Sequence, residues 1–204
     1  MSLAGFLRVW LALFALENLL TLAFVPPPRL RTVMASEIAE SRRVLGDEAT
    51  ERAVRGARES FKAVVRAMPF LEARDESESP IRPARRGFDR VLERGQALVE
   101  LALYRASVQG GFLIPILAII TAAAIDGLAM RRRRAFSFAT TSTAVYNTAS
   151  YLVLSTLVLP LLYLAAAVPV SPAFFPIIGI AAAGAVWVFL AHLPGAAPII
   201  RSRG

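Results

Sequence analysis

Two acidic side chains stand inside stretches that are otherwise apolar, Glu17 near the N-terminus and Asp126 later in the chain. Ionisable groups are costly in such surroundings, so each is a candidate site. Glu17, next to Asn18, could relay protons or pair with another helix; the simpler alternative is a protonated carboxyl group that hydrogen-bonds a neighbouring helix. Asp126 could pair with Arg8 across two helices. Alternatively, Asp126 pairs with Arg133 two turns ahead, and Arg8 extends its guanidinium toward lipid headgroups.

Residue types that carry enzymatic chemistry are scarce. The sequence has no cysteine and one histidine, His192. Disulfides, thiol catalysis and cysteine-ligated metals are therefore excluded. One histidine without nearby acids makes neither a metal site nor a catalytic triad, and no glycine-rich phosphate-binding loop is present. We expect no enzymatic activity, no cofactor and no metal site.

The composition is that of a membrane protein. Hydrophobic residues make up 56% of the 204 residues and form long runs, whereas soluble domains have about one half. The net charge is +8. The segment from Arg29 to Arg105 has both signs of charge, 16 basic and 13 acidic residues, which is typical of a segment in contact with water. The excess arginines lie beside apolar runs, which suits anionic lipid headgroups. They are Arg8, Arg131, Arg132, Arg133, Arg134, Arg201 and Arg203. We expect the lipid bilayer as a partner and no direct nucleic-acid binding.

Four apolar runs are long enough to be transmembrane helices, since each can cross a hydrocarbon core of about 30 Å. They are Leu3–Val25, Gly110–Met130, Tyr146–Val168 and Phe174–Leu193. The first could instead be a cleaved signal peptide, but its length and the carboxylate inside it favour a retained anchor. In the fourth run, Gly179 and Ala183 lie on one face, where small side chains let helices approach closely. They are candidate contacts to another helix, including one from a second copy of the chain.

Residues 26–109, between the first and second runs, predict an extramembrane helical hairpin. Pro26–Arg31 is expected to be a stiff, extended exit from the first run, since three prolines cannot continue a helix. An amphipathic helix follows from Asp47 to Pro69, and a second, beginning near Phe88, is expected to run on into the next span. Each apolar stripe either buries the other or leaves a seam open for another subunit.

Sidedness follows from arginine placement, because short basic loops stay in the cytoplasm. The loop 131–145 carries Arg131–Arg134 and is predicted to be cytoplasmic. Both termini are then cytoplasmic, and residues 26–109 lie in the periplasm of a bacterium. The predicted fold is an all-α polytopic membrane protein in the inner membrane. Its parts are an N-terminal anchor, residues 1–25, the periplasmic hairpin, and a three-helix transmembrane domain, residues 110–204.

The junction around the arginines resembles a known family. The pattern Asp126-Gly127-Leu128, Arg131, Arg134, Ser142 and Tyr146-Asn147-x-Ala149 is similar to that of bacterial integrating-conjugative-element membrane proteins. These contain a domain of unknown function and occur beside conjugative coupling proteins. Asn147 stands where the family pattern has a histidine, which argues against a histidine-based role there. The resemblance implies a part in DNA transfer between cells as a membrane component, not as a motor or nuclease.

Two functional hypotheses follow. The first is an inner-membrane scaffold or interaction component of a conjugative DNA-transfer apparatus, with other membrane proteins of the apparatus, such as a coupling ATPase, as partners. The alternative is a small oligomeric transporter or channel subunit, with the intramembrane carboxylates Glu17 and Asp126 lining a path.

Overall fold

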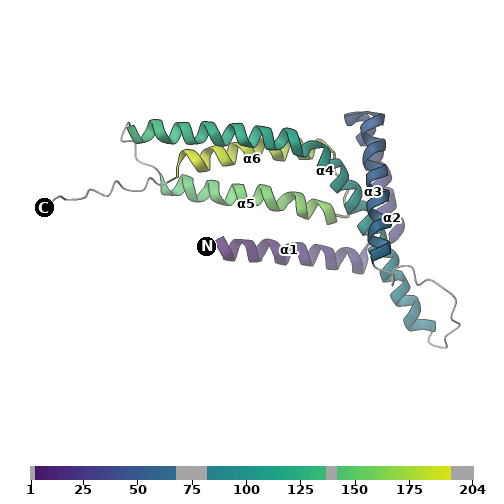
Figure 1. Cartoon of the computed structure of the whole chain (residues 1–204). Helices are drawn as coiled ribbons and strands as arrows, with labels where there is room; N and C mark the ends of the chain where they lie inside the picture. The colour runs from purple at the N-terminus through teal and green to yellow at the C-terminus, as the bar shows by residue number, and fades with distance from the viewer. Residues whose placement is uncertain (1–2, 68–81, 137–141, 194–204) are drawn as a thin grey trace. The chain divides into compact units, whose positions relative to one another are not determined.

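The described part of the chain is built of α-helices. The computed structural model describes residues 3–67, 82–136 and 142–193, and their regular structure is helical throughout (Figure 1). In chain order the helices are α1 Leu3–Phe24, α2 Pro27–Leu45, α3 Asp47–Ala67, α4 Arg82–Phe136, α5 Thr143–Ala165 and α6 Phe174–Ala191. Most of the predicted polar loop after Pro69, part of the basic loop, and the C-terminal arginines Arg201 and Arg203 lie outside the described residues.

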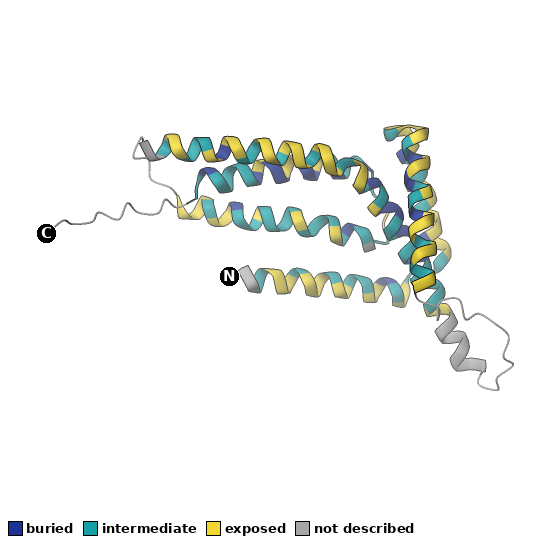
Figure 2. Cartoon of the chain, viewed as in Figure 1, coloured by how far each residue is buried: buried dark blue, intermediate teal, exposed yellow. Residues whose placement is uncertain are grey.

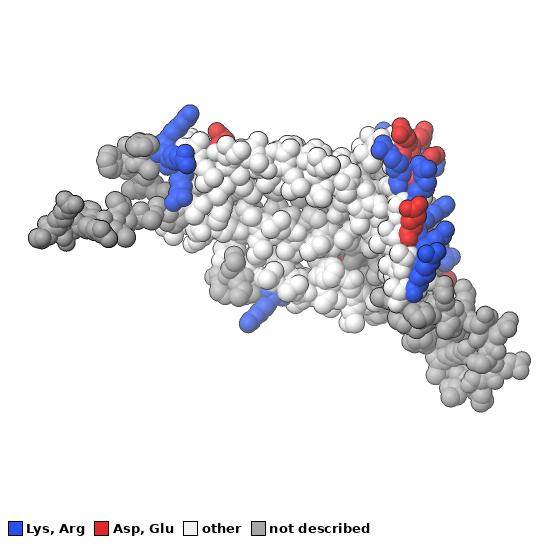
Figure 3. Space-filling view, in the orientation of Figure 1, with Lys and Arg blue, Asp and Glu red and all other residues white. Residues whose placement is uncertain are grey.

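Four of these helices are long and apolar enough to cross a membrane. The segments are Gly5–Phe24, Arg90–Arg134, Thr143–Leu164 and Phe174–Ala191. Large apolar side chains stay exposed along α1, among them Leu11 at 57%, Leu19 at 66% and Phe24 at 76% (Figure 2). In Figure 3 the surface over α5 carries no charge, whereas acidic and basic side chains intermingle over α3. An apolar exposed helix next to mixed-charge helices is the distribution expected of a chain that meets both lipid and water.

Helix α2 corrects one sequence-based expectation. The predicted extended exit ends at Pro26, which has φ −73° and ψ 147°, and a helix starts at Pro27. The first residues of a helix have no intrahelical partner for their N–H groups, so prolines there sacrifice no hydrogen bond, and their fixed φ suits the helix. Arg29 N–H already donates to Pro26 O at 3.0 Å. The prolines therefore begin a helix instead of holding the chain extended.

Gly46 joins α2 to α3 without any other intervening residue. Its φ is +85°, a value that favours glycine, and its N–H donates to Arg42 O at 3.1 Å. This residue ends α2 and lets α3 begin at Asp47, where the sequence predicts a helix start. Helices α2 and α3 pack against each other.

Helix α4 is continuous over 55 residues, and Pro115 lies inside it. It joins the amphipathic segment near Phe88 to the second apolar run, so the expectation that the one continues into the other is confirmed. Its last turn contains Arg133 and Arg134, basic residues at the end where the helix dipole favours them.

The chain divides into two compact units, each with its own core. The first comprises residues 1–114 and 158–176, and α4 is its central helix. Leu98 and Leu101 of α4 pack with Leu30 and Val33 of α2. One turn further along α4, Tyr104 and Val108 pack with Ala53 and Ala57 of α3, Tyr163 of α5 and Phe175 of α6.

The second unit comprises residues 115–157 and 177–204. Most of its buried side chains are small and lie on α6, including Ala182, Ala183 and Ala185. On α5, Ala149 is buried, and the Tyr146 ring stacks on Phe189 of α6 with 5.1 Å between centroids. Small residues let these helix backbones approach closely.

Candidate functional site

The first unit contains a fully buried ion pair between Arg105 of α4 and Glu37 of α2. Arg105 Nη2 lies 2.5 Å from Glu37 Oε1, and Arg105 Nε lies 3.0 Å from Glu37 Oε2. The two side chains are 0% and 2% exposed. This is the two-pronged geometry in which the planar guanidinium matches a carboxylate. We call these two residues and their partners the Arg105 junction.

The remaining donors of Arg105 bind backbone carbonyls at the end of α5 and in the connection to α6. Nη1 donates to Tyr163 O and Ala166 O, both at 2.6 Å, and Nη2 donates to Val168 O at 2.9 Å. The last carbonyls of a helix have no intrahelical N–H donor, so when they are buried they need a donor from elsewhere, as Arg105 provides here. A guanidinium has five N–H donors, and here all five are used.

Glu37 also binds the α5–α6 connection directly. Its Oε1 accepts the backbone N–H of Val170 at 3.0 Å. The carboxylate therefore has a donor on each oxygen and compensates the charge of Arg105. Burying a charge is tolerated only when it is paired and hydrogen-bonded, and both conditions hold here.

Aromatic side chains surround the pair. The Arg105 Cζ atom lies 4.5 Å from the centroid of the Tyr163 ring, a cation–π distance. Tyr104, the neighbour of Arg105 on α4, donates its hydroxyl to Ser41 Oγ of α2 at 2.8 Å. Arg105 also lies close enough to act electrostatically on Glu17, which is half-buried on α1. The junction thus fastens α2, α4 and the α5–α6 connection, and it leaves no donor of Arg105 for a substrate.

A second arginine of α4 contacts the end of α1. Arg94 Nη1 donates to Leu22 O at 3.0 Å and to Ala23 O at 2.7 Å. These carbonyls belong to the last turn of α1, so Arg94 supplies donors to carbonyls at the C-terminal end of that helix. Beside it, Glu93 pairs with Arg31 of α2 at 3.5 Å on the exposed surface.

In the second unit, Asp126 is engaged by a tryptophan. Trp187 Nε1 of α6 donates to Asp126 Oδ2 at 2.6 Å. Gly127 lies against the same residue: a Cβ there would meet Trp187 O at 2.9 Å. One end of α4 is also fastened to α6, because Arg134 Nη1 lies 2.5 Å from His192 Nε2. Neither contact was predicted from the sequence, which paired Asp126 with an arginine and gave no partner for His192.

The other sequence-predicted candidates are dispersed. Gly179 is buried against Ile116 of α4, and Ala183 is buried on the same helix, α6. Tyr146 stacks on Phe189, whereas its neighbour Asn147 is exposed. Arg8, Arg132 and Arg133 are exposed, and Arg131 is half-buried. Within the described ranges, no group of three or more histidine, aspartate or glutamate side chains could hold a metal ion.

Arg105 and Glu37 were missed because the sequence placed them in a solvated, mixed-charge segment. One signal could have found Arg105. It is the single charged residue between Leu101 and Asp126, within the stretch that leads into the second apolar run. Glu37 gives no comparable signal, since it lies on a helix that the sequence analysis did not predict.

The described residues form a helical protein with four membrane-length apolar helices and a buried ion pair, and a comparison with family models identifies the family. Residues 24–193 match the model for DtrJ-like proteins, described as IncC plasmid conjugative DNA transfer proteins. The chain belongs to this DtrJ-like family. The resemblance to conjugative-transfer membrane proteins is therefore confirmed, although the matching family is described for a plasmid and not for an integrating element. No curated protein and no solved structure matches the chain.

Proposed function

We propose that this chain is a non-enzymatic interaction component of a conjugative DNA-transfer apparatus in the bacterial inner membrane. The observation that carries the proposal is the family match over residues 24–193, a range that includes three of the four membrane-length helices and the Arg105 junction. Its partners would be other membrane proteins of the apparatus, such as a coupling ATPase.

The use of polar groups supports a scaffold role. Arg105 and Glu37 use their hydrogen-bonding groups within the chain, and the exposed carboxylate of Asp126 accepts a hydrogen bond from Trp187. An arginine with five internal bonds holds helices in place and has no donor for a reacting group. The exposed apolar side chains of α1, by contrast, are free to meet lipid or another membrane helix.

The proposed orientation has both termini and Arg131–Arg134 in the cytoplasm and residues 26–109 in the periplasm. The arginines in the last turn of α4 support it, since arginines close to the end of an apolar span are retained on the cytoplasmic side; Arg131–Arg134, which the sequence places in a loop, are the helical C-terminal end of α4. Helices α2 and α3 would then present a mixed-charge surface to the periplasm, where a second component could contact it.

Conjugation between cells tests the role. Deleting the gene should abolish or strongly reduce DNA transfer, and the full chain supplied from a second plasmid should restore it. Chemical crosslinking in native membranes followed by copurification should then recover other transfer proteins. Normal transfer frequency in the deletion strain, or a chain recovered alone after crosslinking, would contradict the proposal.

A further inference from the structure

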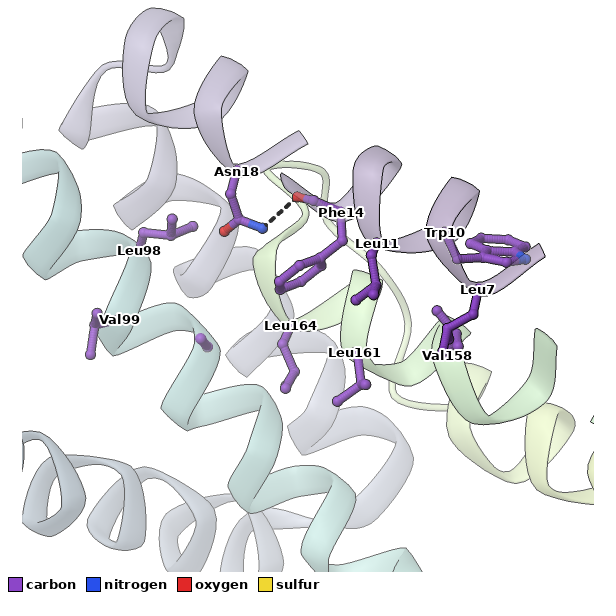
Figure 4. Close-up of a pocket in the computed structure, with 11 residues that line it drawn as sticks. Leu7, Trp10, Leu11, Phe14, Asn18, Leu98, Val99, Val158, Leu161 and Leu164 are labelled. Carbon is purple, nitrogen blue, oxygen red and sulfur yellow. Dashed lines mark hydrogen bonds between the residues drawn. The ribbon is translucent and has the colours of Figure 1, made fainter. Parts of the chain in front are cut away.

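The first unit has a long groove along one side of α1. Its volume is about 480 Å³, and it is lined by α1, α4 and α5 (Figure 4). The α1 side chains Leu7, Trp10, Leu11, Phe14 and Asn18 recur at three- and four-residue spacing and so form one stripe facing the groove. The opposite wall comes from α4, with Leu98 and Ala102, and from α5, with Leu161 and Leu164.

The groove lining selects for hydrocarbon. Among the described residues that form it, Asn18 is the one polar side chain, and its amide nitrogen donates to Phe14 O at 2.8 Å on the same helix. A polar ligand would lose hydrogen bonds to water and gain few here. The occupant must therefore be apolar over the length of the groove.

The groove is long enough for an extended hydrocarbon chain. The rise from Leu7 to Asn18 along α1 is about 16 Å at 1.5 Å per residue. A single acyl chain can lie along that length between α1 and the wall formed by α4 and α5.

A cation lies just beyond one end of the groove. Arg94 precedes the lining residue Leu98 by one turn of α4, and it binds Leu22 O, one turn beyond the lining residue Asn18 on α1. The described residues give Arg94 carbonyl acceptors and no carboxylate partner, and its Nε is buried without a hydrogen-bond partner. Among the described residues, a cation without a carboxylate partner therefore lies near one end of the apolar groove.

We infer that the groove binds one acyl chain of an anionic phospholipid whose phosphate group contacts Arg94. Arginine recognises phosphate through charge and hydrogen bonding, and the hydrocarbon chain fills the space between α1 and the α4–α5 wall. The inference rests on the proposed membrane location. In this arrangement a bound acyl chain fills the space between α1 and the wall formed by α4 and α5.

Trp10 lines the groove and reports on its occupant. The chain has two tryptophans, so Trp187→Phe leaves Trp10 as the only one. The full-length variant is reconstituted in phosphatidylcholine vesicles. In two separate titrations, an increasing fraction of the lipid is replaced by phosphatidylglycerol or by phosphatidylcholine, each with brominated acyl chains that quench tryptophan fluorescence. We expect half-maximal quenching of Trp10 at an about five-fold lower fraction of phosphatidylglycerol, the preference that one arginine near anionic lipid supplies. Native mass spectrometry of the unmodified chain should show phosphatidylglycerol retained over phosphatidylcholine.

Matched variants separate the headgroup from the channel. Arg94→Gln should abolish the preference for phosphatidylglycerol, Arg94→Lys should keep most of it, and Arg90→Gln, at an exposed position one turn earlier, should leave it unchanged. Ala102→Phe, which fills the channel, should reduce quenching by both lipids. Leu157→Phe, at a position 64% exposed elsewhere on α5, should not.

Equal quenching by the two lipids, or an unchanged preference in Arg94→Gln, would overturn the lipid site while leaving the membrane role intact. Disulfide formation between two chains through Leu11→Cys would overturn it as well, since the groove would then face a second copy. A chain washed off the vesicles by alkaline carbonate would refute both the lipid site and the proposed membrane location.

Discussion

Arg105 and Glu37 show how a charged pair becomes tolerable in an apolar interior. Removing two charges from water costs several kcal/mol each, and their attraction offsets this only when the remaining polar atoms are also satisfied. Here both carboxylate oxygens have donors, and the guanidinium has an acceptor for each N–H. Lysine would not be equivalent, because its three donors cannot reproduce the fork.

Arg105→Ala is expected to destabilise the chain by about 3–5 kcal/mol, because it leaves the Glu37 carboxylate buried without its counter-charge. Arg105→Lys should be less severe but still destabilising. Thermal unfolding in detergent measures both. Arg52→Ala is the control, since that arginine is 67% exposed and its pair with Glu48 contributes little.

The double variant Glu37→Leu with Arg105→Met is a sharper test of the junction. Replacing a buried ion pair by apolar residues is often neutral or stabilising. Here it should remain destabilising, because the carbonyls of Ala166 and Val168 lose their Arg105 donors, at about 1–3 kcal/mol each. Stability equal to that of the unsubstituted chain would mean that the carbonyls find other partners.

For individual residues, the sequence indicated some of the polar side chains that make tertiary contacts but not the residues that they contact. Asp126 and His192 were singled out as isolated polar residues beside apolar runs, yet their partners, Trp187 and Arg134, are 61 and 58 residues away. Spacing along one helix predicts local pairs only. Glu37 and Arg105 are separated by 68 residues, so only the folded chain brings them together.

Helices α4 and α6 approach closely at two glycines of the second unit. At Gly179 a Cβ would lie 2.6 Å from Ile116 Cγ1, a side-chain atom, and at Gly127 it would lie 2.9 Å from the backbone oxygen of Trp187. At Gly184, also on α6, nothing lies within 4 Å. The three positions therefore differ in how an added methyl group could be accommodated.

Gly179→Ala should lower the free energy of unfolding by about 1–3 kcal/mol through overpacking. The loss should shrink in the presence of Ile116→Ala, which removes the clashing atoms, so a double-mutant cycle gives a coupling energy. Gly184→Ala is the matched control and should be neutral. Additive effects of Gly179→Ala and Ile116→Ala would show that the two residues do not meet.

Gly127→Ala is expected to be harder to rescue, because the obstructing atom belongs to the backbone of α6. Shortening Leu190, whose Cβ lies 3.2 Å from the added atom, cannot move Trp187 O. The loss of stability should therefore persist in Gly127→Ala with Leu190→Ala. Recovery in the double variant would place the obstruction in the part of the Leu190 side chain beyond Cβ, because alanine keeps the Cβ atom.

Gly46→Ala tests the turn between α2 and α3. With φ at +85°, an alanine there is strained by about 1–2 kcal/mol. Gly95→Ala, in the middle of α4 with nothing within 4 Å, should instead be neutral or stabilising by up to about 1 kcal/mol. Thermal unfolding of the two variants should shift in opposite directions or by clearly different amounts.

At the level of elements, the apolar runs predicted α1, α5 and α6 to within a few residues, whereas the run Gly110–Met130 is only part of the longer helix α4, Arg82–Phe136. Their lengths and composition are properties of each run alone, which is why they could be predicted. Helix α2 was missed because its prolines indicate an extended chain when considered locally, although the first turn of a helix accepts them. Its amphipathic face depends on α4, a partner far along the chain.

At the scale of the whole molecule, the proposed orientation across the membrane can be measured by labelling single cysteines, because the sequence contains none. Single variants Ser60→Cys in α3 and Ser142→Cys before α5 both create an exposed thiol in a chain that has no other. In intact cells with a permeable outer membrane, a membrane-impermeant maleimide should label Ser60→Cys and spare Ser142→Cys. The reverse pattern would invert the proposed orientation, and the compartment of α2 and α3 with it.

The arrangement of the Arg105 junction imposes an order on biogenesis. Glu37 and Arg105 emerge from the ribosome before their carbonyl acceptors, which lie 58 to 63 residues beyond Arg105. In a nascent chain that ends before Tyr163, the Arg105 guanidinium therefore lacks the carbonyl acceptors that it binds in the folded unit. Completion of α5 and its following turn is the step that closes the unit, so truncated products should be recognised by quality-control proteases even when their early helices are intact.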